Sequence, residues 1–192
     1  MAKIHDINES LERELQGQPR SERFYLEVLN ATSIRRIGYK TPKEIELQKQ
    51  DIDLFATIDG EEISISEKDR DRDFDDLLIE FYSVYPDTRG WMDNSEAQMM
   101  AYYTPTKVIW VNKHQLVEFY NNHLKGLPFE KHFNELIKTH STRSNGTFNI
   151  LGQIENVNFI AAYNRTYVTM SIAVSFDLLR RAGVDFTITN LV

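Results

Sequence analysis

The sequence contains no cysteine, so neither disulfides nor thiolate sites can form. This composition is typical of a reducing compartment, and we expect a cytoplasmic location. No apolar run is long enough to span a bilayer, and the first residues, MAKIHDINESLERELQ, lack the apolar core of a secretory signal. Only 8 glycines are present, and none lies in a GxGxxG, GxxxxGKS or GxxxxGKT phosphate loop. The sequence therefore argues against thiol enzymes, membrane partners and the two common nucleotide-binding motifs.

The sequence also lacks the basic surplus that is usual in nucleic-acid binders. It has 22 Lys and Arg against 29 Asp and Glu, a net charge of -7. A local basic face can still coexist with an acidic body. Two clusters of basic and polar residues are candidates for contacts to a nucleic-acid backbone: Arg35, Arg36, Lys40, Lys43, Arg143 and Asn145. Such clusters are also common on ordinary solvated surfaces.

The spacing of apolar residues predicts an α/β protein. Helices are expected over residues 6–16, 21–38, 71–85, 95–103, 112–125, 128–140 and 175–183. Strands are expected over 44–58, 61–68, 107–111, 148–154, 158–163, 167–174 and 185–192, with a polar loop at 141–147. We therefore expect one domain over residues 1–192, in which a mixed β-sheet is flanked by helices. Its core would cover about 20–115, and a C-terminal extension would cover 127–192.

A β-hairpin is the best-defined local feature. The stretch QDIDLFATIDGEEISISEK, residues 50–68, alternates apolar and polar residues on either side of Asp59-Gly60. Asp-Gly favours a two-residue type I′ turn, because glycine accepts the positive φ that this turn requires. With this turn, Ile58 faces Glu61, and the register of the two strands is fixed.

The predicted register brings acidic residues and one lysine together at the open end of the hairpin. Asp53 would lie opposite Ser66, and Asp51 opposite Lys68. Side chains alternate between the two faces of a strand, so these four share one face, whereas Glu67 points to the apolar face.

Carboxylates beside a lysine suit metal-assisted phosphodiester chemistry. Mg²⁺ prefers oxygen ligands and keeps several waters, so one to three carboxylates suffice. The ion would polarise a phosphate oxygen and supply a water of lowered pKa, which a lysine could orient. Glu80, on the helix predicted to follow, could lean back over the hairpin. The alternative is an ordinary half-exposed hairpin, in which Asp51 and Lys68 form a surface ion pair that contributes little.

This order of elements resembles the PD-(D/E)xK nuclease superfamily. Its restriction-endonuclease-like core has an acid on one strand, a hairpin, and a second strand that ends in (D/E)xK before a helix. Asp53 matches the first acid and Lys68 the lysine, while Ser66 stands where the second acid is usual. Some members have SxK at this point and take the missing acid from the following helix, so SEK with Glu80 downstream is similar to that variant. Glu67 is an alternative donor.

The resemblance implies a DNA endonuclease that hydrolyses phosphodiester bonds with Mg²⁺ or Mn²⁺. The catalytic candidates are Asp53, Lys68, Glu67 and Glu80, and the metal-ligand candidates are Asp53, Asp51, Glu67 and Glu80. Such nucleases often dimerise, so DNA and a second copy of the chain are the expected partners. The alternative is a non-catalytic interaction module on a degenerate nuclease scaffold, which Ser66 and the acidic net charge favour.

Overall fold

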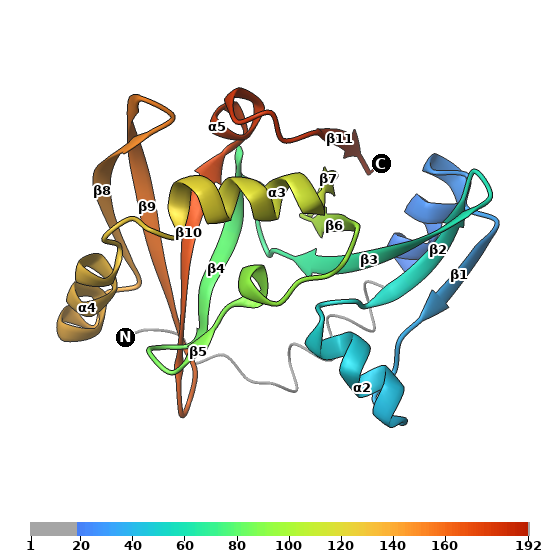
Figure 1. Cartoon of the computed structure of the whole chain (residues 1–192), viewed down its shortest axis with the longest axis horizontal. Coiled ribbons are helices and arrows are strands. Elements are labelled where there is room, and N and C mark those ends of the chain that lie inside the picture. Colours follow the sequence, from blue (N-terminus) through green and yellow to red (C-terminus); the bar gives the residue numbers. More distant parts are fainter. Residues whose placement is uncertain (1–18, 192) are drawn as a thin grey trace. The chain divides into compact units, whose positions relative to one another are not determined.

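The computed structural model describes residues 19–191, and these residues form two compact units (Figure 1). The six-strand unit contains residues 19–73, Asn94–His114 and residues 186–191. The five-strand unit contains Phe74–Asp93 and Gln115–Asp185. The helix predicted over residues 6–16 lies outside the described residues. Residues 74–93, which lie within the predicted core at 20–115, belong to the five-strand unit. The single domain, with its core and C-terminal extension, stays a prediction.

The six-strand unit is built on a mixed sheet, as the α/β prediction requires. The strands have the order β1-β2-β3-β6-β7-β11. Their bounds are β1 Ser33–Arg36, β2 Leu54–Ile58, β3 Glu61–Asp69, β6 Met99–Tyr103, β7 Lys107–Asn112 and β11 Phe186–Asn190. Strands β3 and β6 run parallel, and the other neighbours are antiparallel. The parallel pair is possible because the chain leaves this sheet after β3 and returns to it before β6.

The predicted hairpin is confirmed. Asp59 and Gly60 have φ angles of 51° and 84°, the positive values of a type I′ turn. Ile58 pairs with Glu61, and the register continues from there along β2 and β3. The turn therefore fixes which residues of β3 lie at the open end of the hairpin.

The first part of the strand predicted over 44–58 is instead a helix, α2, Pro42–Lys49. Thr41 accepts a hydrogen bond from the Glu44 backbone, and the Glu44 side chain accepts one from the Thr41 backbone. This reciprocal cap, with Pro42 in the first turn, starts a helix at this point. After the helix, Asp51 adopts φ 59°, and this left-handed residue turns the chain toward β2.

The helix predicted over 21–38 is also only partly correct. Its helical part runs through η1, Phe24–Val28, and Asn30 then adopts φ 53° before β1 begins. Phe24 and Tyr25 are fully buried on the apolar side of the hairpin, in a core cluster with Leu54 and Ile65. Phe24 and Tyr25 thus cover the face of the hairpin opposite the predicted site.

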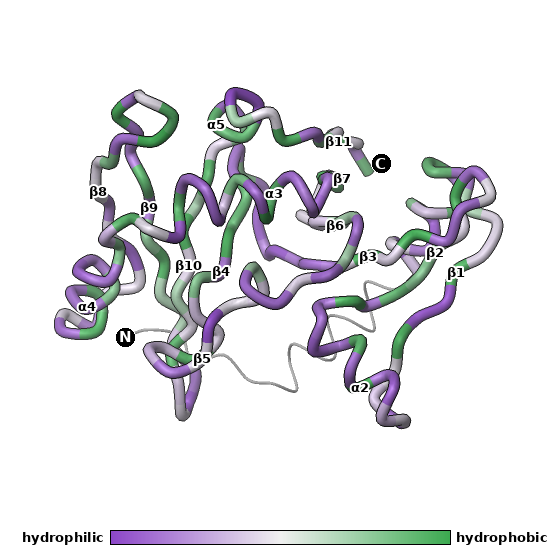
Figure 2. The backbone as a smooth tube through the Cα atoms, in the orientation of Figure 1, coloured by the Kyte–Doolittle hydropathy of each residue, from purple (hydrophilic) through white to green (hydrophobic). Residues whose placement is uncertain are grey.

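The five-strand unit contains an antiparallel sheet with the order β5-β4-β10-β9-β8. The strand bounds are β4 Asp76–Val84, β5 Thr88–Arg89, β8 Arg143–Ile150, β9 Gln153–Tyr163 and β10 Val168–Ser175. The helical bounds are η2 Trp91–Asp93, α3 Lys113–Phe119, η3 Tyr120–Leu124, α4 Glu130–Thr139 and α5 Phe176–Arg181, and the first two residues of α3 belong to the six-strand unit. Figure 2 shows apolar segments along β4 and β10, neighbouring inner strands of this sheet whose apolar side chains are largely buried.

Three of the secondary-structure predictions for the two sheets are wrong. The segments predicted as helices over 71–85 and 95–103 contain β4 and β6, and the predicted loop at 141–147 is the first part of β8. In β4, Leu77, Ile79 and Phe81 are buried with a period of two, although neighbouring apolar residues also fit a helical spacing. Pairing with β10 and β5 decides between the two patterns. Within residues 19–191, no helix is both long and apolar enough to cross a membrane.

Candidate active site

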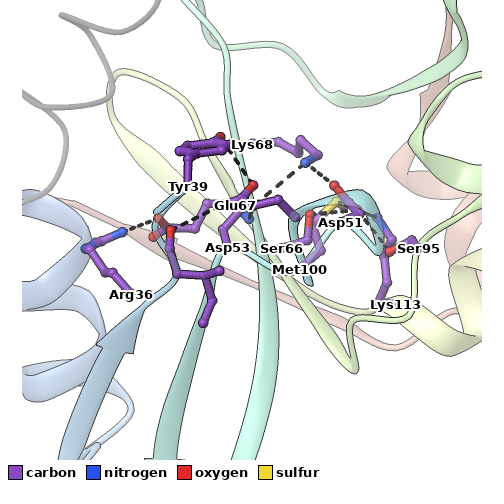
Figure 3. A network of polar contacts seen from close by, with 12 residues as sticks. Arg36, Tyr39, Asp51, Asp53, Ser66, Glu67, Lys68, Ser95, Met100 and Lys113 are labelled. Carbon is purple, nitrogen blue, oxygen red and sulfur yellow. Dashed lines mark hydrogen bonds and ion pairs between the residues drawn. The ribbon is translucent and has the colours of Figure 1, made fainter. Parts of the chain in front are cut away.

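The candidate site lies at the open end of the hairpin, where the chain enters β2 beside the end of β3 (Figure 3). The Asp53 backbone N–H donates to the carbonyl of Ile65, so Asp53 continues the ladder beyond the last paired residue of β2. The Lys68 Nζ lies 2.5 Å from Asp51 Oδ1 and 3.9 Å from Asp53 Oδ2. The structure therefore brings together the two predicted carboxylates and the ammonium, although Asp51 lies in the turn after α2 and not on a strand opposite Lys68, as the sequence predicted.

Asp51 is the buried centre of this site. Its Oδ1 accepts a hydrogen bond from Lys68, and its Oδ2 accepts from Ser66 Oγ and Ser95 Oγ, both at 2.9 Å, and from Lys113 Nζ at 3.1 Å. Burial tends to raise the pKa of the Asp51 carboxyl, but the neighbouring ammonium groups outweigh burial and hold this pKa below its ordinary value. Asp51 is therefore an ionised, fully engaged carboxylate that holds its neighbours in place.

Lys113 is the residue that sequence reasoning missed. It follows β7 directly, and its side chain is fully buried between Asp51 and the sulfur of Met100, which is 3.8 Å from Nζ. Burial lowers the pKa of the Lys113 ammonium to about 7; Asp51 opposes this shift, and Lys68 adds to it. The contact with Asp51 spans 62 positions of sequence, so no local pattern could have revealed it. Ser95, whose hydroxyl contacts Asp51 across 44 positions of sequence, was missed for the same reason.

Asp53 is the more accessible carboxylate, with 27% of its side chain exposed against 9% for Asp51. Its Oδ2 accepts a hydrogen bond of 2.6 Å from the backbone N–H of Glu67. Burial raises the pKa of the Asp53 carboxyl above its ordinary value, and the Lys68 ammonium acts against this shift. Asp53 is thus held firmly at one oxygen while part of its side chain stays open to solvent.

Glu67 is held on the other face of β3. Its carboxylate accepts hydrogen bonds from Arg36 Nη1 at 2.6 Å and from the Tyr25 hydroxyl at 2.9 Å. Arg36 also donates to Ser21 Oγ at 2.5 Å. These contacts match the predicted orientation of Glu67 toward the apolar side. Arg36, which the sequence suggested as a nucleic-acid contact, is engaged by Glu67 and Ser21. A catalytic or metal-binding role for Glu67 stays a prediction.

We expect Glu67→Gln to lower the free energy of unfolding by about 1–3 kcal/mol, because a partly buried carboxylate loses its charge-assisted hydrogen bonds to Arg36 and Tyr25. The matched control is Glu62→Gln, whose exposed pair with Arg35 should contribute less than about 1 kcal/mol. Urea unfolding of both variants measures the difference. Equal losses in the two variants would contradict the structural role of Glu67.

Glu80 is not on a helix that follows the hairpin, as the sequence predicted. It lies on β4, in the five-strand unit, and accepts a hydrogen bond of 2.5 Å from Ser83 Oγ. Two apolar patterns overlap in this segment, and strand pairing selects the period of two. This segment is a strand, so it forms no helix that could bring Glu80 over the hairpin. The geometric reason for including Glu80 in the site is therefore lost.

The predicted nucleic-acid contacts divide between the two units. Arg35 and Arg36 lie on β1, while the exposed Lys40 and Lys43 lie just before and within the first turn of α2. Arg35 is exposed, pairs with Glu62 at 3.1 Å and stacks over Phe55. Arg143 and Asn145 are exposed on β8 of the five-strand unit, not in a loop. The first cluster thus shares a unit with the candidate site.

The donor atoms of the site determine whether it suits a divalent cation. Among residues 19–191, no group of three or more Asp, Glu, His or Cys side chains is arranged to hold a metal ion. Mg²⁺ can, however, be held by one or two carboxylates together with waters and substrate oxygens. The partly exposed Asp53 carboxylate meets that lesser requirement, and it already tolerates the positive charge of Lys68 at 3.9 Å. The residues therefore fit a weakly held hard cation.

Comparisons with protein-family models, with curated proteins and with solved structures found no match to this chain. Function is therefore inferred from the geometry of the site.

Proposed function

We propose that the protein is a metal-dependent nuclease that hydrolyses phosphodiester bonds of DNA at Asp53 and Lys68. The observation that carries this proposal is the position of the Lys68 ammonium on β3, 3.9 Å from the carboxylate of Asp53, which directly precedes β2 and donates its backbone N–H to Ile65, and 2.5 Å from the carboxylate of Asp51. Segments fixed by a backbone ladder give reacting groups the rigidity that such chemistry requires.

In this proposal Asp53 would hold Mg²⁺ or Mn²⁺. When bound, such an ion polarises a phosphate oxygen and lowers the pKa of a coordinated water. The Glu67 backbone N–H fixes the orientation of the Asp53 carboxylate. Lys68 would place its positive charge beside the phosphate and stabilise the negative charge that develops there. Asp51, whose two oxygens are already engaged, anchors Lys68 and is not required as a metal ligand.

The environment of Ser66 supports this reading. Ser66 stands where the resembled superfamily usually has its second acid. Its hydroxyl donates to Asp51 Oδ2 at 2.9 Å, so a carboxylate lies one hydrogen bond beyond the serine side chain. Asp51 therefore supplies a carboxylate beside position 66, where it anchors Lys68. Arg35, Lys40 and Lys43, in the same unit, would contact the DNA backbone, and a homodimer would let each copy cut one strand.

One observation favours the alternative, a non-catalytic interaction module. Asp51 is compensated by two ammonium groups and two hydroxyls, an arrangement that is complete without a metal ion. A buried network whose polar groups satisfy one another's hydrogen bonds can have a purely structural role.

Cleavage assays on the purified wild-type chain separate these two functions. Supercoiled plasmid, single-stranded DNA and RNA would each be incubated with Mg²⁺, Mn²⁺, Ca²⁺ or EDTA. We expect nicking or linearisation of the plasmid with Mg²⁺ or Mn²⁺ and none with EDTA. Cleavage of RNA alone would reassign the substrate, and intact substrates under every metal condition would refute the nuclease and leave the interaction module.

A further inference from the structure

The Asp51 carboxylate is bound differently on its two sides. The inner oxygen, Oδ2, accepts from Lys113, Ser66 and Ser95. The Lys113 side chain has no exposed surface, so this side is closed to solvent. The outer oxygen, Oδ1, accepts from Lys68, whose side chain is 23% exposed. One ammonium is therefore enclosed in the protein, and the other is partly exposed to solvent. Figure 3 shows both lysines directed toward Asp51.

This asymmetry lowers the free-energy cost of moving the Lys68 ammonium away from Asp51. A buried carboxylate that loses its single counter-charge is strongly destabilised. If Lys68 were the single cation beside Asp51, a shift of Lys68 toward a substrate phosphate would leave Asp51 in that condition. With Lys113 in place, Asp51 keeps one ammonium and two hydroxyl donors after Lys68 has moved. Lys68 is then able to change partners at small cost.

We propose that Lys113 is a positioning residue that remains as the counter-charge of Asp51 and thereby frees Lys68 to exchange Asp51 for a phosphate oxygen of the substrate. This inference rests on the proposed nuclease function and deepens it. Lys113 itself is enclosed, so it acts through Asp51 and Lys68 and does not touch the substrate. Without Lys113, Lys68 becomes the main counter-charge of Asp51 and stays bound to it.

The salt dependence of DNA binding provides a readout that a purely structural role would leave unchanged. Each lysine that contacts a phosphate adds about 0.9 to the slope of log affinity against log salt for duplex DNA. The binding of a short duplex would be measured at several salt concentrations in EDTA, where no cleavage occurs, and at pH 6, below the Lys113 pKa of about 7, so that this lysine carries its charge. We expect Lys68→Met and Lys113→Met each to reduce the magnitude of this slope by about 0.9, the value for one phosphate contact. The double variant Lys113→Met/Asp51→Asn should recover the wild-type slope, because a neutral amide no longer retains Lys68.

Lys113→Gln, which keeps a hydrogen-bond donor without the charge, is the second variant should Lys113→Met fail to fold, as judged by circular dichroism. A folded Lys113→Met or Lys113→Gln with the wild-type slope overturns the role of Lys113, as does a double variant that stays at the reduced slope. A wild-type slope in Lys68→Met overturns it too, since Lys68 then makes no phosphate contact. Wild type that does not bind the duplex instead refutes the proposed function itself, so the two failures are distinguishable.

Discussion

Lys68→Met and Asp53→Asn are each expected to lower the rate of Mg²⁺-dependent plasmid cleavage by at least about 100-fold. Removing a single preorganised group that stabilises transition-state charge typically costs a factor of about 100 to 1,000. Lys68 is the ammonium of the site that reaches solvent, and Asp53 is its more exposed carboxylate, so both are positioned to meet a phosphate. Rates from gel densitometry at saturating Mg²⁺ would measure the loss.

Two variants provide matched controls in the same unit. Lys49→Met removes an exposed lysine of α2 that pairs with Glu46. Asp59→Asn changes an acid in the hairpin turn, where its φ of 51° suits asparagine equally well. Both are expected to cleave within about 3-fold of wild type, because neither alters the charge beside the reacting phosphate. A Lys68→Met variant that kept more than a tenth of the wild-type rate would contradict the proposed site.

The stability of the protein is expected to rise as the pH increases from 7 to 10, because of Lys113. Burial lowers the pKa of this ammonium from its ordinary value of 10.5 to about 7. Between these two values the unfolded chain binds a proton that the folded chain does not, so removal of protons from solution favours folding. The contribution is about 1 kcal/mol per pH unit within this window, or about 3 kcal/mol in total.

Urea unfolding at pH 7, 8, 9 and 10 would test this contribution as a difference between variants. Lys113→Met/Asp51→Asn removes both charges of the buried pair, so the extra rise with pH should disappear. Asp51→Asn alone should retain the rise, because the enclosed Lys113 is still present and has lost its carboxylate neighbour. Parallel pH profiles for wild type and the double variant would show that Lys113 keeps its proton throughout this range.

The sequence alone predicted the hairpin because every cause of it is local. Asp59-Gly60 selects the turn, the turn fixes the register, and the period of two fixes the faces. The meeting of Asp53 and Lys68 follows from that register, and so does the opposite orientation of Glu67. The capping signals of α2 were also local, in Thr41 and Glu44, but the alternation of neighbouring residues concealed them.

The sequence could not decide β4, β6 and β8 because their patterns fit more than one structure. Apolar residues at 74, 77, 78 and 81 fit a helix, and those at 77, 79 and 81 fit a strand equally well. Strand pairing with β10, more than 80 positions away at Tyr82 and Met170, settled the choice for β4. Edge strand β8 is polar and mostly exposed on alternate residues, so its composition resembles that of a loop.

What the sequence by itself determined was the hairpin and the end of it at which Asp53 and Lys68 lie, since neighbouring residues there specify one another. What only the tertiary structure decided was the second lysine. Parallel pairing of β3 with β6, and antiparallel pairing of β6 with β7, carry Lys113 to Asp51 from 62 positions away. An enclosed charge gives no signal in a sequence, because its partner is chosen by packing and not by position along the chain.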